Sequence, residues 1–146
     1  MRKSILLVED NPDDAALTVR ALKKNQLPND ITVVHDGVQA LDYLYGQGSF
    51  EGRDTREMPE LVLLDLKLPL LDGIDVLKRL RADERTKLLP VVILTSSNED
   101  QDRMNAYGCG ANSYVRKPVD FATFVAAAAQ LGLYWTDLNL PAPGRT

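Results

Sequence analysis

The stretch Leu61-Val62-Leu63-Leu64-Asp65 is a run of four apolar residues that ends in an acid. A continuous apolar run of this length is typical of a strand that helices cover on both faces of a parallel sheet. Four further short apolar blocks are spaced along the chain, at Ser4–Val8, Ile31–His35, Val91–Thr95 and Asn112–Val115. With Leu61–Asp65, they predict five strands.

Segments with the apolar spacing of amphipathic helices follow each of these strands. Phe121–Leu131 has the clearest pattern, with a stripe at i, i+3, i+4 and i+7. The other helices are expected at Asp13–Gln26, Val38–Tyr45, Gly73–Ala82 and Asp100–Tyr107. A strand followed by a helix, five times over, predicts an α/β fold: a doubly wound parallel sheet with helices on both faces and right-handed crossovers.

Length and composition exclude several classes of protein. The 146 residues suit one domain, and the formal charge of −4 provides no clustered basic face for nucleic acid or anionic lipid. No apolar run is long enough to span a bilayer, and the single cysteine, Cys109, cannot form an internal disulfide. We therefore expect a cytoplasmic protein that binds neither nucleic acid nor a membrane.

Charged and hydroxyl side chains stand where four of the five strands end. In an open parallel sheet, ligands bind beyond the carboxyl ends of the strands, so these residues are expected to meet at one edge. They are Glu9 and Asp10 after the first strand, Asp65 after the third, Thr95 after the fourth and Lys117 after the fifth. The pattern brings three carboxylates, a hydroxyl and an ammonium group together.

Three carboxylates at one place repel each other, and a hard divalent cation relieves that repulsion. Mg²⁺, or Mn²⁺ in its place, is the expected cofactor, because it binds carboxylates together with water and phosphoryl oxygens. A carboxylate beside the cation can attack phosphorus and form an aspartyl-phosphate. Lys117 and Thr95 would then donate to the phosphoryl oxygens.

The chain resembles the receiver domains of two-component response regulators over roughly residues 4–131. The chemotaxis response regulator is the minimal example of that family. Four stretches carry the resemblance: Ile5-Leu6-Leu7-Val8-Glu9-Asp10-Asn11, Leu63-Leu64-Asp65-Leu66-Lys67-Leu68-Pro69-Leu70-Leu71-Asp72-Gly73, Pro90-Val91-Val92-Ile93-Leu94-Thr95-Ser96 and Ser113-Tyr114-Val115-Arg116-Lys117-Pro118.

The resemblance implies a flavodoxin-like fold with strand order 2-1-3-4-5 and a role for each matching residue. It implies that Asp65 accepts the phosphoryl group and that Lys117 is the family's lysine before a cis proline, here Pro118. It also implies that Thr95 and Tyr114 form the switch pair. The metal ligands it implies are Glu9, Asp10, Asp65 and the backbone carbonyl of Lys67.

A narrower resemblance concerns the long connection Gly46–Pro59 and the aromatic tail after Leu131. These features are similar to those of small stand-alone receivers that partner bacteriophytochrome-type histidine kinases. We expect a receiver domain at residues 1–131 and an extension at 132–146 without an output domain. The expected function is that of a stand-alone response regulator in a two-component phosphorelay. It would take phosphate from a sensor histidine kinase and switch a protein-binding surface, and a homodimer is left open.

Other interpretations of these residues exist. The acids Glu9 and Asp10 could be helix-capping residues, and Asp65 could form only a structural ion pair with Lys117. A phosphatase that uses an aspartyl-phosphate typically has a second acid two residues after the nucleophile, where this chain has Lys67. A flavodoxin-like electron carrier needs a phosphate loop, which these acids would repel. A degenerate receiver that only binds a partner would lack several of the matching residues, and all of them are present.

Overall fold

The structure is a computed structural model that describes residues 3–23, 29–117 and 120–143. Its sheet consists of β1 (Lys3–Val8), β2 (Asn29–Val34), β3 (Leu61–Leu64), β4 (Val91–Thr95) and β5 (Ser113–Arg116). The strands are parallel and lie in the order β2-β1-β3-β4-β5. The predicted fold class and strand order are thus confirmed.

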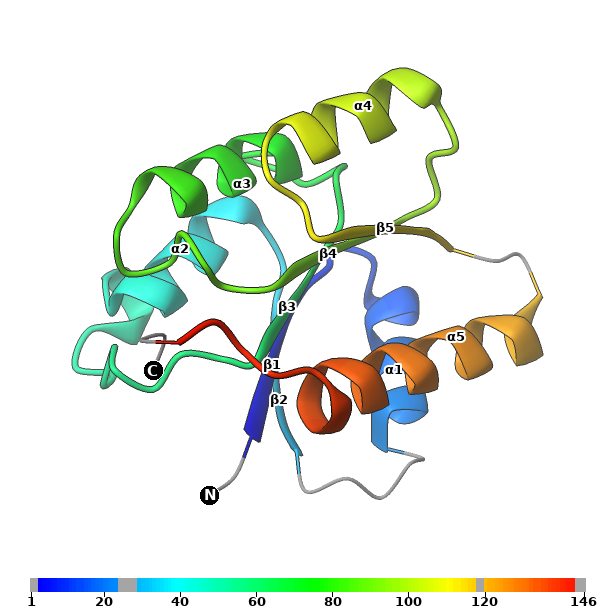
Figure 1. The fold of residues 1–146 in the computed structure, drawn as a ribbon, viewed down its shortest axis with the longest axis horizontal. Helices are drawn as coiled ribbons and strands as arrows, with labels where there is room; N and C mark the ends of the chain where they lie inside the picture. The colour runs from blue at the N-terminus through cyan, green and yellow to red at the C-terminus, as the bar shows by residue number, and fades with distance from the viewer. Residues whose placement is uncertain (1–2, 24–28, 118–119, 144–146) are drawn as a thin grey trace.

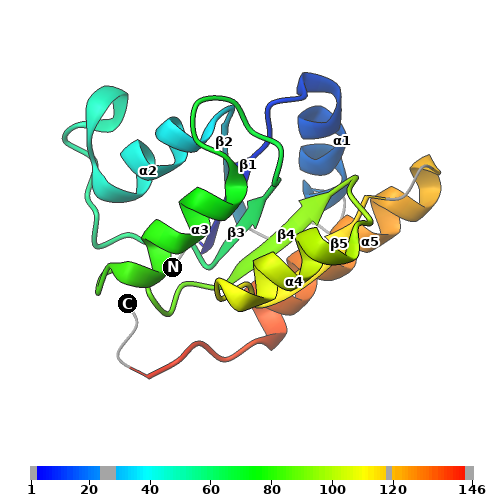
Figure 2. The same cartoon turned by 90° about the horizontal axis from the view of Figure 1, so that it is seen from above.

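Five α-helices cover the sheet in two layers. They are α1 (Pro12–Lys23), α2 (Gly37–Tyr45), α3 (Gly73–Ala82), α4 (Asp100–Gly108) and α5 (Phe121–Leu133). Figures 1 and 2 show α2, α3 and α4 on one face of the sheet and α1 with α5 on the other. Alternate side chains of the central strands pack into one layer or the other, which explains why β3 and β4 are buried throughout.

Side chains set the beginnings of several helices. The carboxylates of Asp36, Asp72 and Asp120 accept backbone N–H donors at the first turns of α2, α3 and α5. Each satisfies a donor that the helix itself cannot pair. These caps place the first turns of α2 and α3 at the same edge of the sheet as the ends of β1 and β3.

The long connection after α2 is an ordered loop. It contains the 3-10 turn η1 (Gly48–Phe50), and the guanidinium group of Arg53 stacks on the Tyr43 ring at 3.9 Å. Arg53 also donates to the backbone carbonyl of Tyr43 at 2.9 Å. These contacts hold the loop against the half-buried Tyr43 of α2, so the loop is anchored despite its length.

The last helix continues further than the apolar spacing predicts. α5 ends at Leu133 and is followed at once by the π-helical turn η2 (Tyr134–Leu138). The buried hydroxyl of Thr136 donates to the Gly132 carbonyl at 2.6 Å, and Trp135 packs against the core on the α1 side. The expected boundary at residue 131 therefore falls within a continuous helical segment, and the division into domain and extension stays a prediction.

Over the same described ranges, no helix is both long and apolar enough to cross a membrane. The cis peptide bond that the resemblance implies between Lys117 and Pro118 lies outside these ranges.

Candidate functional site

The register of β1 and β3 brings the first acids together. Val8 pairs with Leu64, and the N–H of Asp65 donates to the Val8 carbonyl at 3.1 Å. The residues that follow these two strands therefore leave the sheet at the same level. One carboxylate oxygen each of Glu9, Asp10 and Asp65 lies within 4.8 Å of the others.

These three carboxylates differ in their exposure to water. Glu9 is 2% exposed and Asp65 7% exposed, whereas Asp10 is exposed at the surface. Burial, with a smaller contribution from the charge of Asp65, raises the pKa of Glu9 to about 7 against the opposing hydrogen bond from Lys117. Two buried acids and one exposed acid fit a hard divalent cation, which would neutralise them and retain contact with water. The acidic cluster is consistent with a divalent-metal site.

Lys117 lies directly after β5 and reaches into this cluster. Its ammonium nitrogen contacts a carboxylate oxygen of Glu9 and lies 3.0 Å from Asp65 Oδ2 and 3.0 Å from Asp14 Oδ2. Burial alone would lower the pKa of Lys117, but the hydrogen bond with Glu9 and the charges of Asp65 and Glu9 outweigh it and raise that pKa above its usual value. The ammonium group therefore stays charged beside the Asp65 carboxylate.

The hydroxyl groups of Thr95 and Tyr114 are both in contact with Ser97. The Ser97 N–H lies 3.4 Å from Oγ1 of Thr95, which is fully buried at the end of β4. The Tyr114 hydroxyl donates to the Ser97 carbonyl at 3.1 Å. The Ser97 hydroxyl in turn donates to Asp102 Oδ2 on α4 at 2.5 Å. One loop residue thus connects the end of β4 and Tyr114 of β5 with the first turn of α4.

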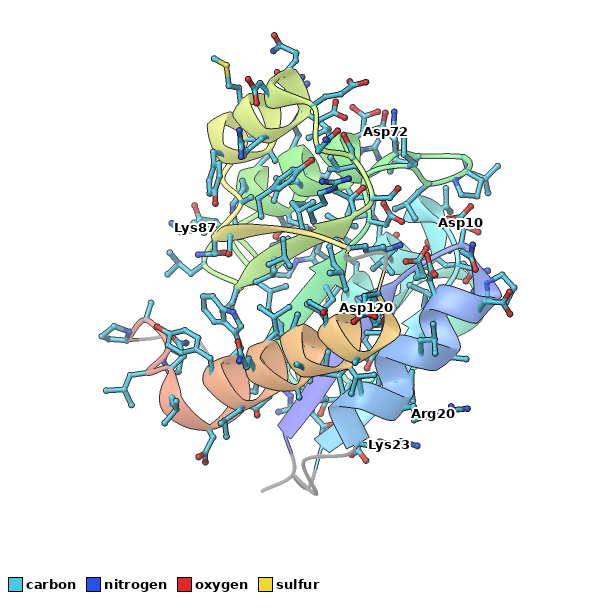
Figure 3. The ribbon with its side chains drawn as sticks, turned by 90° about the vertical axis from the view of Figure 1, so that its right-hand side faces the viewer. Asp10, Arg20, Lys23, Asp72, Lys87 and Asp120 are labelled. Carbon is cyan, nitrogen blue, oxygen red and sulfur yellow. The ribbon has the colours of Figure 1, made fainter. Side chains whose placement is uncertain are left out.

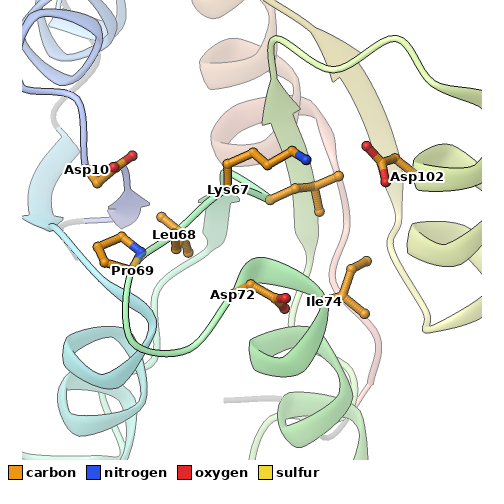
Figure 4. A pocket seen from close by; sticks show the side chains of 8 residues that line it. Asp10, Lys67, Leu68, Pro69, Asp72, Ile74 and Asp102 are labelled. Atoms are coloured by element: carbon orange, nitrogen blue, oxygen red, sulfur yellow. The ribbon is translucent and has the colours of Figure 1, made fainter.

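A cavity of about 460 Å³ opens beside Asp10 at this edge of the sheet. Its lining residues are Asp10, Leu66, Lys67, Leu68, Pro69, Asp72, Ile74 and Asp102. Figure 4 shows the Lys67 side chain extending away from Asp10 and toward the side on which Asp102 lies. The cavity therefore reaches the exposed member of the acidic cluster, Asp10, and its charged wall comes from both helical and strand-end residues.

The loop that follows Asp65 is held tightly against α3. The Gly73 N–H donates to the Leu66 carbonyl at 2.9 Å, and the Lys67 N–H lies 3.3 Å from Asp65 Oδ1. A side chain at Gly73 would begin only 2.3 Å from the backbone oxygen of Asp65. The absence of a side chain there lets the backbone around Asp65 pack onto the helix.

The structure brings together the residues that sequence reasoning placed at one edge: Glu9, Asp10, Asp65, Thr95 and Lys117 all lie there, with Tyr114 joined through Ser97. It adds Asp14 and Asp102, which the sequence patterns did not single out for the site, and it shows Ser97 as a link between Thr95, Tyr114 and Asp102. For Asp14 a signal existed, since it lies in the first turn of the helix that follows the first strand, and that turn begins at the same edge of the sheet.

Comparisons with a family model, with known sequences and with solved structures all identify the same family. The family model for the response regulator receiver domain matches residues 5–129. The response regulator Rcp1 of Synechocystis sp. is 33% identical over 96% of this chain and 94% of its own length. Its Mn²⁺-bound crystal structure has a TM-score of 0.88, with 31% identity over 96% of this chain and 99% of that one.

Two further solved structures are similar over almost the whole chain. The phosphorylated cyanobacterial phytochrome response regulator RcpA has a TM-score of 0.90 and 31% identity, and the match covers 97% of this chain and 99% of that one. The bacteriophytochrome response regulator RtBRR is 49% identical, with a TM-score of 0.77 over 99% of this chain and 87% of that one. This chain, which carries its acids and its lysine at the strand ends of a five-stranded α/β sheet, belongs to the response regulator receiver domain family and has a role in two-component signalling.

Proposed function

We propose that Asp65 accepts a phosphoryl group from a sensor histidine kinase and that the phosphorylated chain presents an altered protein-binding surface. The observation that carries this proposal is the contact of 3.0 Å between Lys117 Nζ and Asp65 Oδ2, in a cluster where Asp65 is one of three carboxylates. One carboxylate oxygen of Asp65 would attack phosphorus. The bond from phosphorus to the kinase histidine nitrogen breaks, and that nitrogen keeps its electron pair.

The roles of the neighbouring residues follow from their positions. Glu9, Asp10, Asp65 and the backbone carbonyl of Lys67 would hold Mg²⁺ or Mn²⁺, which supplies positive charge next to the phosphoryl oxygens when bound. The Lys117 ammonium group would neutralise negative charge that develops on the phosphoryl oxygens. The Thr95 hydroxyl, whose contact with Ser97 is long at 3.4 Å, turns to donate to a phosphoryl oxygen.

A change at Thr95 has a short path to the surface. Ser97 contacts Thr95 through its N–H and Tyr114 through its carbonyl. Movement of the loop after β4 therefore alters the position of Tyr114 and of α4, which Ser97 also contacts through Asp102. In this proposal the chain is a switch rather than an enzyme acting on a separate substrate, and its output is a protein contact on the face of α4, β5 and α5.

Within the histidine kinases, we propose one of the bacteriophytochrome type as the phosphoryl donor. Similarity to RtBRR and RcpA, whose names state that they are phytochrome response regulators, supports this choice. The cytoplasmic location and the absence of nucleic-acid and membrane partners stay predictions from composition.

The test is incubation with acetyl phosphate and Mg²⁺, followed by intact mass measurement and size-exclusion chromatography. The wild-type chain should gain the mass of one phosphoryl group, and Asp65→Asn should gain none while it folds normally. Asp72→Asn is the matched control, because Asp72 lines the cavity beside Asp10 without belonging to the acidic cluster. Phosphate retained by Asp65→Asn would refute the assignment, and the elution volume reports any linked self-association.

A further inference from the structure

Asp14 contacts the lysine of the site from a different element. It lies in the first turns of α1, and its Oδ2 is 3.0 Å from Lys117 Nζ. The Lys117 side chain is 8% exposed, whereas the Asp14 side chain is 36% exposed. The buried ammonium group therefore has one carboxylate partner on its solvent side, in addition to its buried partners Glu9 and Asp65.

The start of α1 fixes the place of this carboxylate. The Asn11 side chain accepts the N–H of Asp14 at 3.1 Å, and the Thr18 hydroxyl donates to the Asp14 carbonyl at 2.8 Å. Figure 3 shows Asp10 beside the first turn of α1, at the end of the helix opposite Arg20 and Lys23. Asp14 is thus held on a rigid helical turn next to the acidic cluster.

Asp14 differs from the other two partners of Lys117, because phosphoryl transfer requires no other contact of its carboxylate. Glu9 and Asp65 belong to the cluster that could hold a cation, and Asp65 also forms the new bond to phosphorus. Their oxygens are therefore needed for other contacts during the reaction. Asp14 is not in that cluster, so its carboxylate is free to keep its hydrogen bond with the lysine. An ammonium group has three N–H donors and no acceptor, so it can hold Asp14 and still donate to a phosphoryl oxygen.

We propose that Asp14 is a positioning residue: it holds the Lys117 ammonium group beside Asp65 while the other carboxylates change their contacts. This inference rests on the proposed function, because it concerns the same phosphoryl transfer. Acids in the first turn of a helix also stabilise the helix through its dipole. Asp13 lies in the same first turn and has no described contact with Lys117. A substitution of Asp13 therefore changes the interaction with the helix dipole without removing a partner of the lysine.

The first measurement is the rate of phosphorylation by acetyl phosphate in Mg²⁺. Asp14→Asn should slow it about tenfold, in line with the usual cost of removing a partner that orients a functional side chain. Asp13→Asn, which removes the same charge from the same turn, should leave the rate within about twofold of wild type. Equal rates for the two variants would overturn the proposal.

A second measurement needs neither metal nor phosphate. In EDTA, Asp14→Asn should lower the melting temperature of the wild-type chain. The shift should be more negative than the shift that the same substitution causes in a Lys117→Met background. In that background Asp14 has lost its ammonium partner and keeps only its interaction with the helix dipole and with acidic neighbours, so its removal should lower the melting temperature less than in the wild type, or raise it. The same shift in both backgrounds would show that Asp14 does not act through Lys117. Absence of any phosphoryl group on Asp65 in the wild-type chain would instead refute the proposed function, and this inference with it.

Discussion

Gly73 offers the sharpest test of how the backbone positions Asp65. An alanine Cβ at this position would lie 2.3 Å from the Asp65 carbonyl oxygen and 2.8 Å from Leu66 Cα. Both atoms belong to the backbone, so no side chain can turn aside to make room. We therefore expect Gly73→Ala to force α3 and the loop after β3 apart.

Two opposing effects determine the magnitude. Overpacking of a close contact costs about 1–3 kcal/mol, whereas alanine in place of glycine at a helical position contributes about 0.4–1 kcal/mol through the unfolded chain. The net loss should be about 1–2 kcal/mol. With a urea m-value of about 2 kcal/mol/M, this corresponds to a midpoint lower by about 0.5–1 M.

Gly108→Ala is the matched control. Gly108 lies at the end of α4, and a Cβ there meets no atom within 4 Å. This variant should therefore be as stable as the wild type or slightly more stable. The assay is urea unfolding of both variants, combined with the rate at which acetyl phosphate modifies Asp65.

Displacement of the loop should also slow the modification of Asp65 in Gly73→Ala, because a shift of about 1 Å in a reacting group can cost up to a hundredfold in rate. A Gly73→Ala protein with the stability of Gly108→Ala and an unchanged rate would refute the argument. It would mean that the loop can move away without cost.

Two further outcomes follow from the same geometry. Since the pKa of Glu9 is raised from 4.5 to about 7, the folded chain holds a proton in that range that the unfolded chain has lost, so metal-free stability should fall as pH rises from 4.5 to 7. Mg²⁺ displaces this proton, so it should raise the melting temperature more at pH 8 than at pH 6, and equal gains would contradict the assignment. Separately, Arg81 donates to the carbonyls of Leu89 at 2.8 Å and Gly110 at 2.9 Å. Arg81→Lys cannot span both and should lose about 2 kcal/mol in urea unfolding, whereas Arg79→Lys, exposed on the same helix, should lose little.

The strands could be predicted from the sequence because a parallel sheet buried on both faces leaves a plain signal. The run Leu61–Leu64 is apolar at every position, and every one of its residues is buried. The strand ends were equally accessible to prediction, since parallel strands bring their carboxyl ends to one edge. The proximity of Glu9, Asp65 and Lys117 follows from that rule with no knowledge of side-chain geometry.

The contacts that depend on helix placement could not be predicted in this way. Asp14 and Lys117 are separated by 103 positions, and no local pattern couples a residue of the first helix to the end of the last strand. The link from Ser97 to Asp102 depends on the turn before α4, the helix with the weakest apolar pattern. The continuation of the helical segment from α5 into η2 was not predicted, because Thr136 and Trp135 extend no apolar stripe and are held by contacts with Gly132 and the core.

The charges of the site explain why the metal-free chain can fold and still favour a cation. Lys117 supplies one positive charge to three carboxylates, and the exposed Asp10 adds a fourth negative group. The lysine therefore offsets enough repulsion to bury Glu9 and Asp65, but it leaves an excess of negative charge. Burial raises the pKa of Glu9 most, and the charge of Asp65 adds to that rise. A bound proton relieves the excess negative charge partly, and a divalent cation relieves it more fully. The acidic residues that destabilise the metal-free site are therefore the same residues that favour binding of a divalent cation.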